Sequence, residues 1–213
     1  NIICDQGNNH FTVATGVIIS ADGYILSNAH IADDLSNTPT CAIRKGSPAV
    51  DFGTARLIYL PKAYRTAPSD EIRGRHDIAI WKLDTDTMLT FFGIDFESKT
   101  KPGEEFLTLS YPAELLSSQI ILGGLNLVFS NTTVTAVDDF LIQSRATLSA
   151  QHGSSGGILV DPYTARIRGL IFGINQDSAI AQRALYAINP FAINQTLLEE
   201  KQKTLTEFIA TRP

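Results

Sequence analysis

The sequence predicts an all-β fold, a sandwich or a barrel, that is followed by a single helix. Roughly a dozen short runs of β-branched and aromatic residues alternate with turns that contain Gly, Asn or Pro. The turn at Asp22 and Gly23 lies between two such runs, which is typical of a β-hairpin. A helical spacing of apolar residues begins only after Asn189.

The expected strands follow one another along most of the chain. They cover residues 11–19, 24–27, 41–44, 53–60, 78–83, 105–112, 119–129, 131–137, 139–144, 158–160, 167–174 and 184–188. Residues 61–75 are polar and carry four basic side chains, so we expect an exposed loop there.

The end of the chain predicts one helix. Asn189 can cap its first turn and Pro190 suits its first position. Phe191, Leu198 and Leu205 then recur at helical spacing with charged residues between them. We therefore expect residues 190–213 to form a helix that packs on the β domain or leads into a segment outside this chain.

Composition excludes several classes of protein. The chain has 213 residues, enough for one large β domain or two small ones, and 44% of them are hydrophobic. A charged fraction of 18% argues against disorder, and a net charge of −5 argues against a nucleic-acid partner. No apolar run approaches the roughly 20 residues of a membrane span, so we expect none within this chain.

Two cysteines, Cys4 and Cys41, leave two alternatives open. They can form one disulfide, which fits an exported protein, or remain two buried thiols. The sequence contains no Cys-x-x-Cys pair and no His-Glu-x-x-His, so we expect no metal site and no cofactor.

The stretch from Gln151 to Val160 is the first candidate for chemistry. Two serines in a glycine-rich turn precede an apolar strand. Such a turn can expose a hydroxyl nucleophile and aim backbone N–H groups at the same point, although glycine-serine turns also occur as plain hairpins. Two further residues supply what the turn lacks. His30 follows a buried strand and Asp77 precedes one, so a base and a buried acid are available.

Four segments resemble one family in the order that family uses. The stretch Gly16–His30 resembles its histidine segment and His76–Ala79 its aspartate segment. Its serine segment is matched by Ile142–Ser144 followed by Gly153–Gly157, and the strand that lines its substrate groove by Arg168–Asn175. The chain thus resembles a chymotrypsin-fold serine protease, most closely the HtrA/Deg branch.

This resemblance implies two antiparallel six-stranded β-barrels within residues 1–189, with the active site between them. Ser155 would attack the scissile carbonyl, His30 would accept its proton, and Asp77 would orient the imidazole. The N–H groups of Gly153 and Ser155 would form the oxyanion hole. Peptides or unfolded proteins are the implied substrates.

One departure from the family bears on activation. Trypsin-like enzymes have an aspartate at the position of Ser154, where it pairs with the new amino terminus after zymogen cleavage. Serine cannot form that ion pair, so we expect no activation by N-terminal ion pairing.

The resemblance also locates the pocket for the residue before the scissile bond. Ser149 would lie near its base and Phe172, Gly173 and Ile174 would form its wall. His152 stands beside the oxyanion turn, where two roles are open: contact with substrate, or a place on the polar rim only. None of these side chains is acidic. We therefore expect small or medium apolar residues rather than Arg or Lys.

Two rival functions remain. A catalytically silent relative could use the groove to bind a peptide or a partner. The pattern Gly-x-Ser-x-Gly at residues 153–157 also matches an esterase elbow, but that needs a strand–turn–helix context and the order Ser, Asp, His.

By family habit and the cysteine pair we expect an exported protein: periplasmic, secreted, or held at the cell surface, where a segment outside this chain could anchor it to a membrane. Its oligomeric state stays open.

Overall fold

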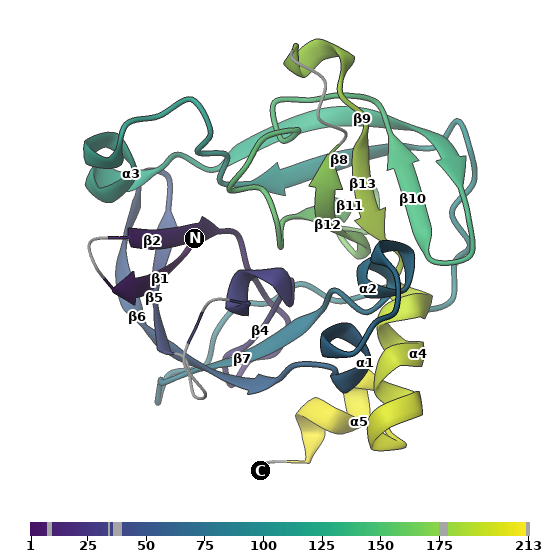
Figure 1. The fold of residues 1–213 in the computed structure, drawn as a ribbon, viewed down its shortest axis with the longest axis horizontal. Coiled ribbons are helices and arrows are strands. Elements are labelled where there is room, and N and C mark those ends of the chain that lie inside the picture. The colour runs from purple at the N-terminus through teal and green to yellow at the C-terminus, as the bar shows by residue number, and fades with distance from the viewer. Residues whose placement is uncertain (8–9, 34, 36–39, 175–178, 212–213) are drawn as a thin grey trace.

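Two antiparallel β-sheets form the body of the protein in the computed structural model, which describes residues 1–7, 10–33, 35, 40–174 and 179–211 (Figure 1). The first sheet contains β1 (Ile2–Gly7), β2 (His10–Ala14), β3 (Val17–Ile18), β4 (Tyr24–Ser27), β5 (Thr40–Gly46), β6 (Ala49–Tyr59) and β7 (Ala79–Leu83). The second contains β8 (Glu105–Ser110), β9 (Val128–Val137), β10 (Leu141–Ser144), β11 (Ile158–Val160), β12 (Ile167–Ile174) and β13 (Leu185–Ile188).

The first sheet is curled, with the strand order β2-β1-β5-β6-β7-β4-β3. Its two edge strands, β2 and β3, follow each other in the chain and correspond to the single strand expected over residues 11–19. The break falls at Thr15, whose backbone N–H donates to Ser155 O, in the turn before β11, at 2.8 Å instead of continuing a ladder. This sheet therefore has seven strands where the resemblance implied six: one expected strand is divided at Thr15, and β1 precedes the first strand that the sequence pattern predicted.

The second sheet is a closed six-stranded barrel with the order β10-β13-β12-β11-β8-β9. Antiparallel pairing joins every pair of neighbours, and β12 and β13 pair in the register Leu170↔Ile188. The expected all-β, chymotrypsin-like architecture with a C-terminal helical segment is confirmed, although only the second of the two expected barrels is closed and the first is a curled sheet. Because all these strands are antiparallel, their connecting loops gather at the barrel ends, where the candidate site lies.

The C-terminal segment packs against both sheets but forms two helices, α4 (Pro190–Lys201) and α5 (Leu205–Ala210), rather than one (Figure 1). Asn189 caps α4 as expected, since its side chain accepts from Ala192 N at 2.8 Å. The helix ends at Gln202, which has a left-handed φ of 54°. Thr204 and Glu207 then form a capping box that starts α5.

Burial explains why the helices stay on the β-sheets. Ile193, Leu197 and Leu205 belong to one hydrophobic cluster with residues of both sheets, among them Ile80 of β7 and Leu170 of β12. The helices therefore cover the line where the two sheets meet.

Three further helices replace elements that the sequence indicated differently. The expected loop at 61–75 contains α1 (Lys62–Arg65) and α2 (Asp70–Arg75), the second capped by the Ser69 side chain. The strand expected at 119–129 is wrong over its first half, because residues Ser118–Gly124 form α3. Ser117 caps α3, and the short apolar run behind it has no periodicity that separates helix from strand. Two 3₁₀ turns cover His30–Ala32 (η1) and Ile180–Gln182 (η2).

Cys4 and Cys41 form a disulfide in this structure. They lie on β1 and β5, which are neighbouring strands, and both are buried. Strand β1 itself was not anticipated from the sequence.

The described residues contain no helix that is both long and apolar enough to span a bilayer. They also contain no group of three or more His, Cys, Asp or Glu side chains arranged to hold a metal ion.

Candidate active site

Strand pairing brings His30 and Asp77 together. Strands β4 and β7 are antiparallel neighbours in the register Ser27↔Ala79. His30 follows the last residue of β4 by three positions, and Asp77 precedes the first residue of β7 by two. Because the end of one strand lies beside the start of the other, both residues emerge at the same edge of the sheet.

Asp77 holds His30 by two hydrogen bonds. His30 Nδ1 lies 2.7 Å from Asp77 Oδ2, and the backbone N–H of His30 donates to Asp77 Oδ1 at 2.8 Å. Asn28 also holds Asp77 in place, since its side-chain amide donates to the backbone carbonyl oxygen of Asp77 at 2.8 Å. Asp77 is buried, and both of its carboxylate oxygens thus have partners.

The electrostatics of this pair favour a charged imidazole. Burial lowers the pKa of His30, but the Asp77 carboxylate, through its charge and its hydrogen bond, outweighs that effect and raises the pKa above its usual value. The Nδ1 contact leaves Nε2 as the nitrogen available to a reacting group. The neighbouring His76 turns the other way, with its Nδ1 3.0 Å from Thr196 Oγ1 of α4.

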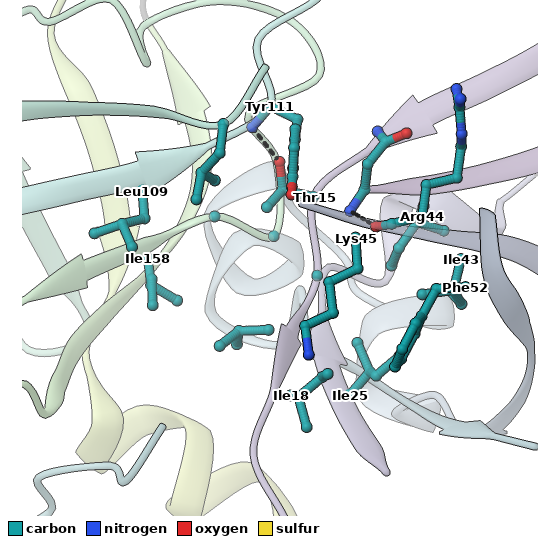
Figure 2. Close-up of a pocket in the computed structure, with 17 residues that line it drawn as sticks. Thr15, Ile18, Ile25, Ile43, Arg44, Lys45, Phe52, Leu109, Tyr111 and Ile158 are labelled. Atoms are coloured by element: carbon teal, nitrogen blue, oxygen red, sulfur yellow. Dashed lines mark hydrogen bonds between the residues drawn. The ribbon is translucent and has the colours of Figure 1, made fainter. Parts of the chain in front are cut away.

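The serine turn is held against the first sheet by Thr15. Besides the bond from its N–H to Ser155 O, Thr15 donates its hydroxyl to Gly153 O at 2.8 Å. The same hydroxyl accepts from Tyr111 N at 2.9 Å, which Figure 2 shows between the two sheets. Gly156 packs so tightly here that a Cβ would lie 2.0 Å from Thr15 O, and its φ is +82°. Only glycine fits that position.

Two backbone N–H groups of the turn face away from its internal hydrogen bonds. The carbonyl oxygen of His152 accepts from Ala113 N at 2.8 Å, and that of Ser154 accepts from Gly157 N at 2.8 Å. In a trans peptide the carbonyl and the next N–H point in opposite directions. The N–H groups of Gly153 and Ser155 are therefore directed outwards, and neither has an acceptor within the part of the chain that the structure describes.

His30 and Ser155 line one cavity of about 310 Å³. Within the described chain, no hydrogen bond joins His30 Nε2 to Ser155 Oγ. Contacts of this kind are often long before substrate binds and shorten in the complex. The cavity therefore brings the candidate base and nucleophile to one space without a direct bond between them.

All the residues expected to bind substrate line this cavity. They are Ser149, His152, Phe172, Gly173 and Ile174. Ser149 is fully buried at the barrel wall, where its hydroxyl donates to Thr108 Oγ1 at 2.9 Å. Gln151 and Ile171 also line the cavity and were not anticipated. Asn175, which ends the groove segment of the sequence motif, lies outside the described residues.

A second cavity of about 280 Å³ shares His30 and Phe172 with the first. Asp33, Tyr64 and Arg73 form a hydrogen-bonded group on its wall, where Tyr64 OH donates to Asp33 Oδ2 at 2.7 Å. Because the cavities share two lining residues, they are adjacent, and we refer to the two together as the groove.

Ser154 is buried beneath the turn and makes a neutral contact. Its hydroxyl accepts from Ser110 Oγ at 3.0 Å. Sequence reasoning missed the residues that support the site from elsewhere in the chain: Asn28, which binds Asp77, and Thr15, Ala113, Glu114 and Arg183, which bind the serine turn. Their partners are tens of residues away, so no local pattern could have pointed to them.

A closed barrel and a curled sheet with this site between them define a chymotrypsin-like serine peptidase fold. The chain belongs to the trypsin-like peptidase domain family, whose family model matches residues 14–170. Family membership and fold together support a serine peptidase.

Three solved structures of similar fold are distant from this chain in sequence. A Glu endopeptidase in complex with MPD has a TM-score of 0.63 at 17% identity, over 95% of this chain and 90% of that one. A serine endoprotease from Yersinia pestis has a TM-score of 0.62 at 20% identity, over 93% of this chain and 61% of that one. The MamO protease domain from Magnetospirillum magneticum, in its apo form, has a TM-score of 0.60 at 16% identity, over 95% and 96%.

Proposed function

We propose that this protein is a serine endopeptidase in which Ser155, His30 and Asp77 form the catalytic triad. The observation that carries the proposal is the arrangement around one cavity. His30 is bound to buried Asp77 on one side, and Ser155 lies in a turn with two unpaired outward N–H groups on the other. Acyl transfer requires this combination of base, nucleophile and oxyanion donors.

The reaction follows from these positions. His30 Nε2 accepts the Ser155 hydroxyl proton as Oγ attacks the scissile carbonyl, and Asp77 stabilises the imidazolium that forms. The N–H groups of Gly153 and Ser155 bind the tetrahedral oxyanion. The imidazolium then protonates the leaving amine, and water repeats the sequence to release the acyl group.

The groove favours peptides over small esters. Its two cavities are adjacent and share His30, so a chain of several residues has contacts that an isolated ester would not make. The order His30, Asp77, Ser155 on a β scaffold also differs from that of an esterase elbow.

The pocket supports a preference for small or medium apolar residues before the scissile bond. Ile171, Phe172 and Ile174 supply apolar walls, and none of the described residues that line the cavity is acidic. A buried Arg or Lys would have no carboxylate partner there. The proposed similarity to HtrA/Deg proteases rests on the sequence motifs.

Export is the location we infer, because a disulfide such as Cys4–Cys41 persists in oxidising compartments.

A peptide-library digest tests the proposal. We expect wild-type protein to cleave within peptides, after Val, Ala or Leu, and Ser155→Ala to cleave none. Ser154→Ala is the matched control, since it removes the neighbouring buried hydroxyl and keeps the nucleophile. Cleavage dominated by Arg, Lys or acidic residues would refute the specificity. Binding of peptides without turnover by wild-type protein would favour the silent relative.

A further inference from the structure

The residues around the oxyanion turn include an ion pair that the proposed reaction does not use directly. Arg183 contacts Glu114 in a bidentate manner, with Nη1–Oε2 at 2.7 Å and Nη2–Oε1 at 2.8 Å. Glu114 lies in the loop after β8 and Arg183 just before β13. Bidentate pairs of this type combine charge with a fixed geometry.

Both partners also bind the backbone of the serine turn. Glu114 Oε2 accepts from His152 N at 3.1 Å, and Arg183 Nη1 donates to Ala150 O at 2.9 Å. Ala113, the residue before Glu114, donates its N–H to His152 O. His152 is thus held on both sides by adjacent residues of one loop, and Arg183 fastens that loop to the turn.

We propose that the Glu114–Arg183 pair positions the oxyanion hole. The peptide between His152 and Gly153 has two orientations, related by a flip of its plane. The bond from Ala113 to His152 O selects the one in which the Gly153 N–H faces the cavity. With Ala113 held in place by its neighbour Glu114, the ion pair biases this peptide towards the active orientation.

The serine at position 154, where trypsin-like enzymes have an aspartate, is consistent with a positioning role for the Glu114–Arg183 pair. A trypsin-like aspartate at that position orders the turn through the amino terminus, whereas Ser154 meets only the Ser110 hydroxyl. The ion pair contacts the backbone of the same turn at His152 and Ala150 and supplies charge from two side chains of the fold. The Arg183 hydrogen bonds lower the pKa of Glu114 to about 2, so the carboxylate is ionised at neutral pH.

Steady-state kinetics test this proposal, which rests on the proposed peptidase function. We expect Glu114→Ala and Arg183→Met to lower kcat about 10–100-fold with KM changed less than about threefold. Loss of an entire oxyanion donor, at 10²–10³-fold, sets the upper limit. Glu114→Gln preserves the shape of the side chain and should lie between wild type and Glu114→Ala. The double variant should be no slower than the slower single variant, because each change breaks the same pair.

Three further measurements separate positioning from simple destabilisation. Titration with a fluorophosphonate counts reactive sites, so that kcat is expressed per active molecule. A peptide boronic acid, which mimics the tetrahedral intermediate, should lose affinity in proportion to kcat, while a product peptide should not. Arg183→Lys retains the positive charge but cannot make the bidentate contact of the guanidinium, so it should keep more activity than Arg183→Met and less than wild type.

Asp22→Asn provides the matched control. Asp22 pairs with Lys82 at 3.2 Å in the first sheet, and its side chain is partly exposed, as Glu114 is. That variant should keep kcat. If wild type turns over and Glu114→Ala or Arg183→Met retains kcat within twofold per titrated site, the ion-pair proposal is wrong. If wild type neither reacts with the probe nor cleaves peptides, the proposed function itself fails.

Discussion

The carboxylate of Asp77 contacts His30 through both of its oxygens, one at the ring and one at the backbone. The backbone contact fixes the position of the residue, and the ring contact fixes the orientation of the imidazole. A histidine held in this way can carry a positive charge next to a buried anion. Two predictions follow from the pair.

The first concerns pH. Asp77 raises the pKa of His30, and the proposed general base must be neutral. We therefore expect kcat/KM to fall on the acid side with an apparent pKa above 6.5. Because the pKa of His30 is higher in the folded state than its ordinary value of 6.5, protonation of His30 stabilises the fold below pH 6.5. This contribution is lost as the pH rises through the folded-state pKa. A kcat/KM profile from pH 5 to 9 measures the first effect, and an apparent pKa below 6.5 would contradict it.

Asp77→Asn tests the orienting role of the acid. Asparagine keeps the size of the side chain but removes the charge and can favour the wrong tautomer of His30. For triads of this type we expect kcat to fall by about 10⁴-fold and the apparent pKa of His30 to drop. Asp33→Asn is the control, because Asp33 bonds to Tyr64 and Arg73 rather than to the ring. Equal losses in the two variants would mean that Asp77 acts only through general charge.

Gly153→Ala tests the shape of the oxyanion turn. Gly153 has a φ of +92°, and a Cβ there would lie 2.8 Å from Tyr111 O. The turn must shift to admit it, so we expect kcat/KM to fall by at least about 10²-fold. Gly103→Ala shares a positive φ, at +90°, but has open space around the new Cβ. That control should lose about 1 kcal/mol of stability and no activity.

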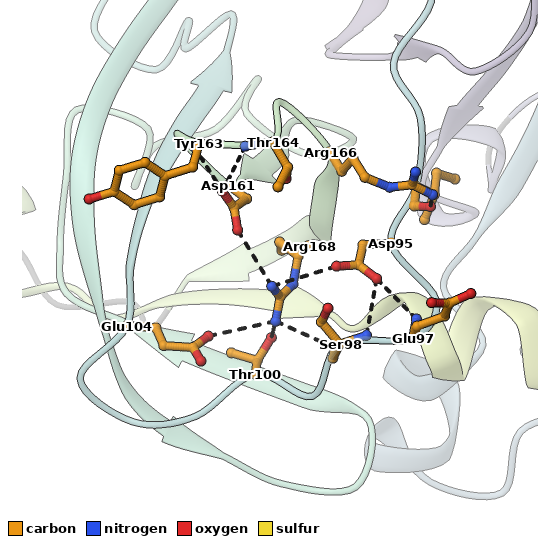
Figure 3. Close-up of polar contacts among 11 residues, drawn as sticks. Asp95, Glu97, Ser98, Thr100, Glu104, Asp161, Tyr163, Thr164, Arg166 and Arg168 are labelled. Carbon is orange, nitrogen blue, oxygen red and sulfur yellow. Dashed lines mark hydrogen bonds and ion pairs between the residues drawn. The ribbon is translucent and has the colours of Figure 1, made fainter.

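Arg168→Met tests whether the ion pairs of Arg168 hold together the second barrel and the segment that connects the two sheets. Arg168 is buried on β12, and its guanidinium lies 3.6–3.7 Å from the carboxylates of Asp95, Glu104 and Asp161 (Figure 3). Asp95 belongs to the segment that connects the sheets. Removal of the cation leaves three carboxylates close together, so we expect a loss of about 3–5 kcal/mol in urea unfolding.

Arg75→Gln serves as the comparison for that loss. Arg75 pairs with Asp139 at an exposed site and should contribute at most about 1 kcal/mol. Similar changes in the two variants would show that the Arg168 cluster is solvated rather than structural.

Local patterns in the sequence predicted much of the fold and of the candidate site. Short strands and the turns that end them are local patterns, and the resemblance of the segments around His30, Asp77 and Ser155 to one protease family assigned the candidate site. The helix at Ser118–Gly124 was missed because an apolar run this short suits either secondary structure. The break between α4 and α5 depends on Gln202 in a left-handed conformation, which a glutamine does not indicate.

The supports of the site could not be predicted for a different reason. Thr15 meets Gly153 across 138 residues, and Glu114 meets Arg183 across 69. Each of these side chains is ordinary in its own neighbourhood. Their roles arise only when the fold brings the two sheets, and the loops between the strands, to the same turn.

The most direct test of the triad is labelling with a fluorophosphonate, followed by mass spectrometry of the digested protein. We expect a single adduct on Ser155, at a rate that falls sharply in His30→Ala. Ser155→Ala should show no adduct, and Ser154→Ala should retain it. An adduct on Ser154 in the wild-type protein, or labelling that persists in Ser155→Ala, would contradict the assignment of the nucleophile.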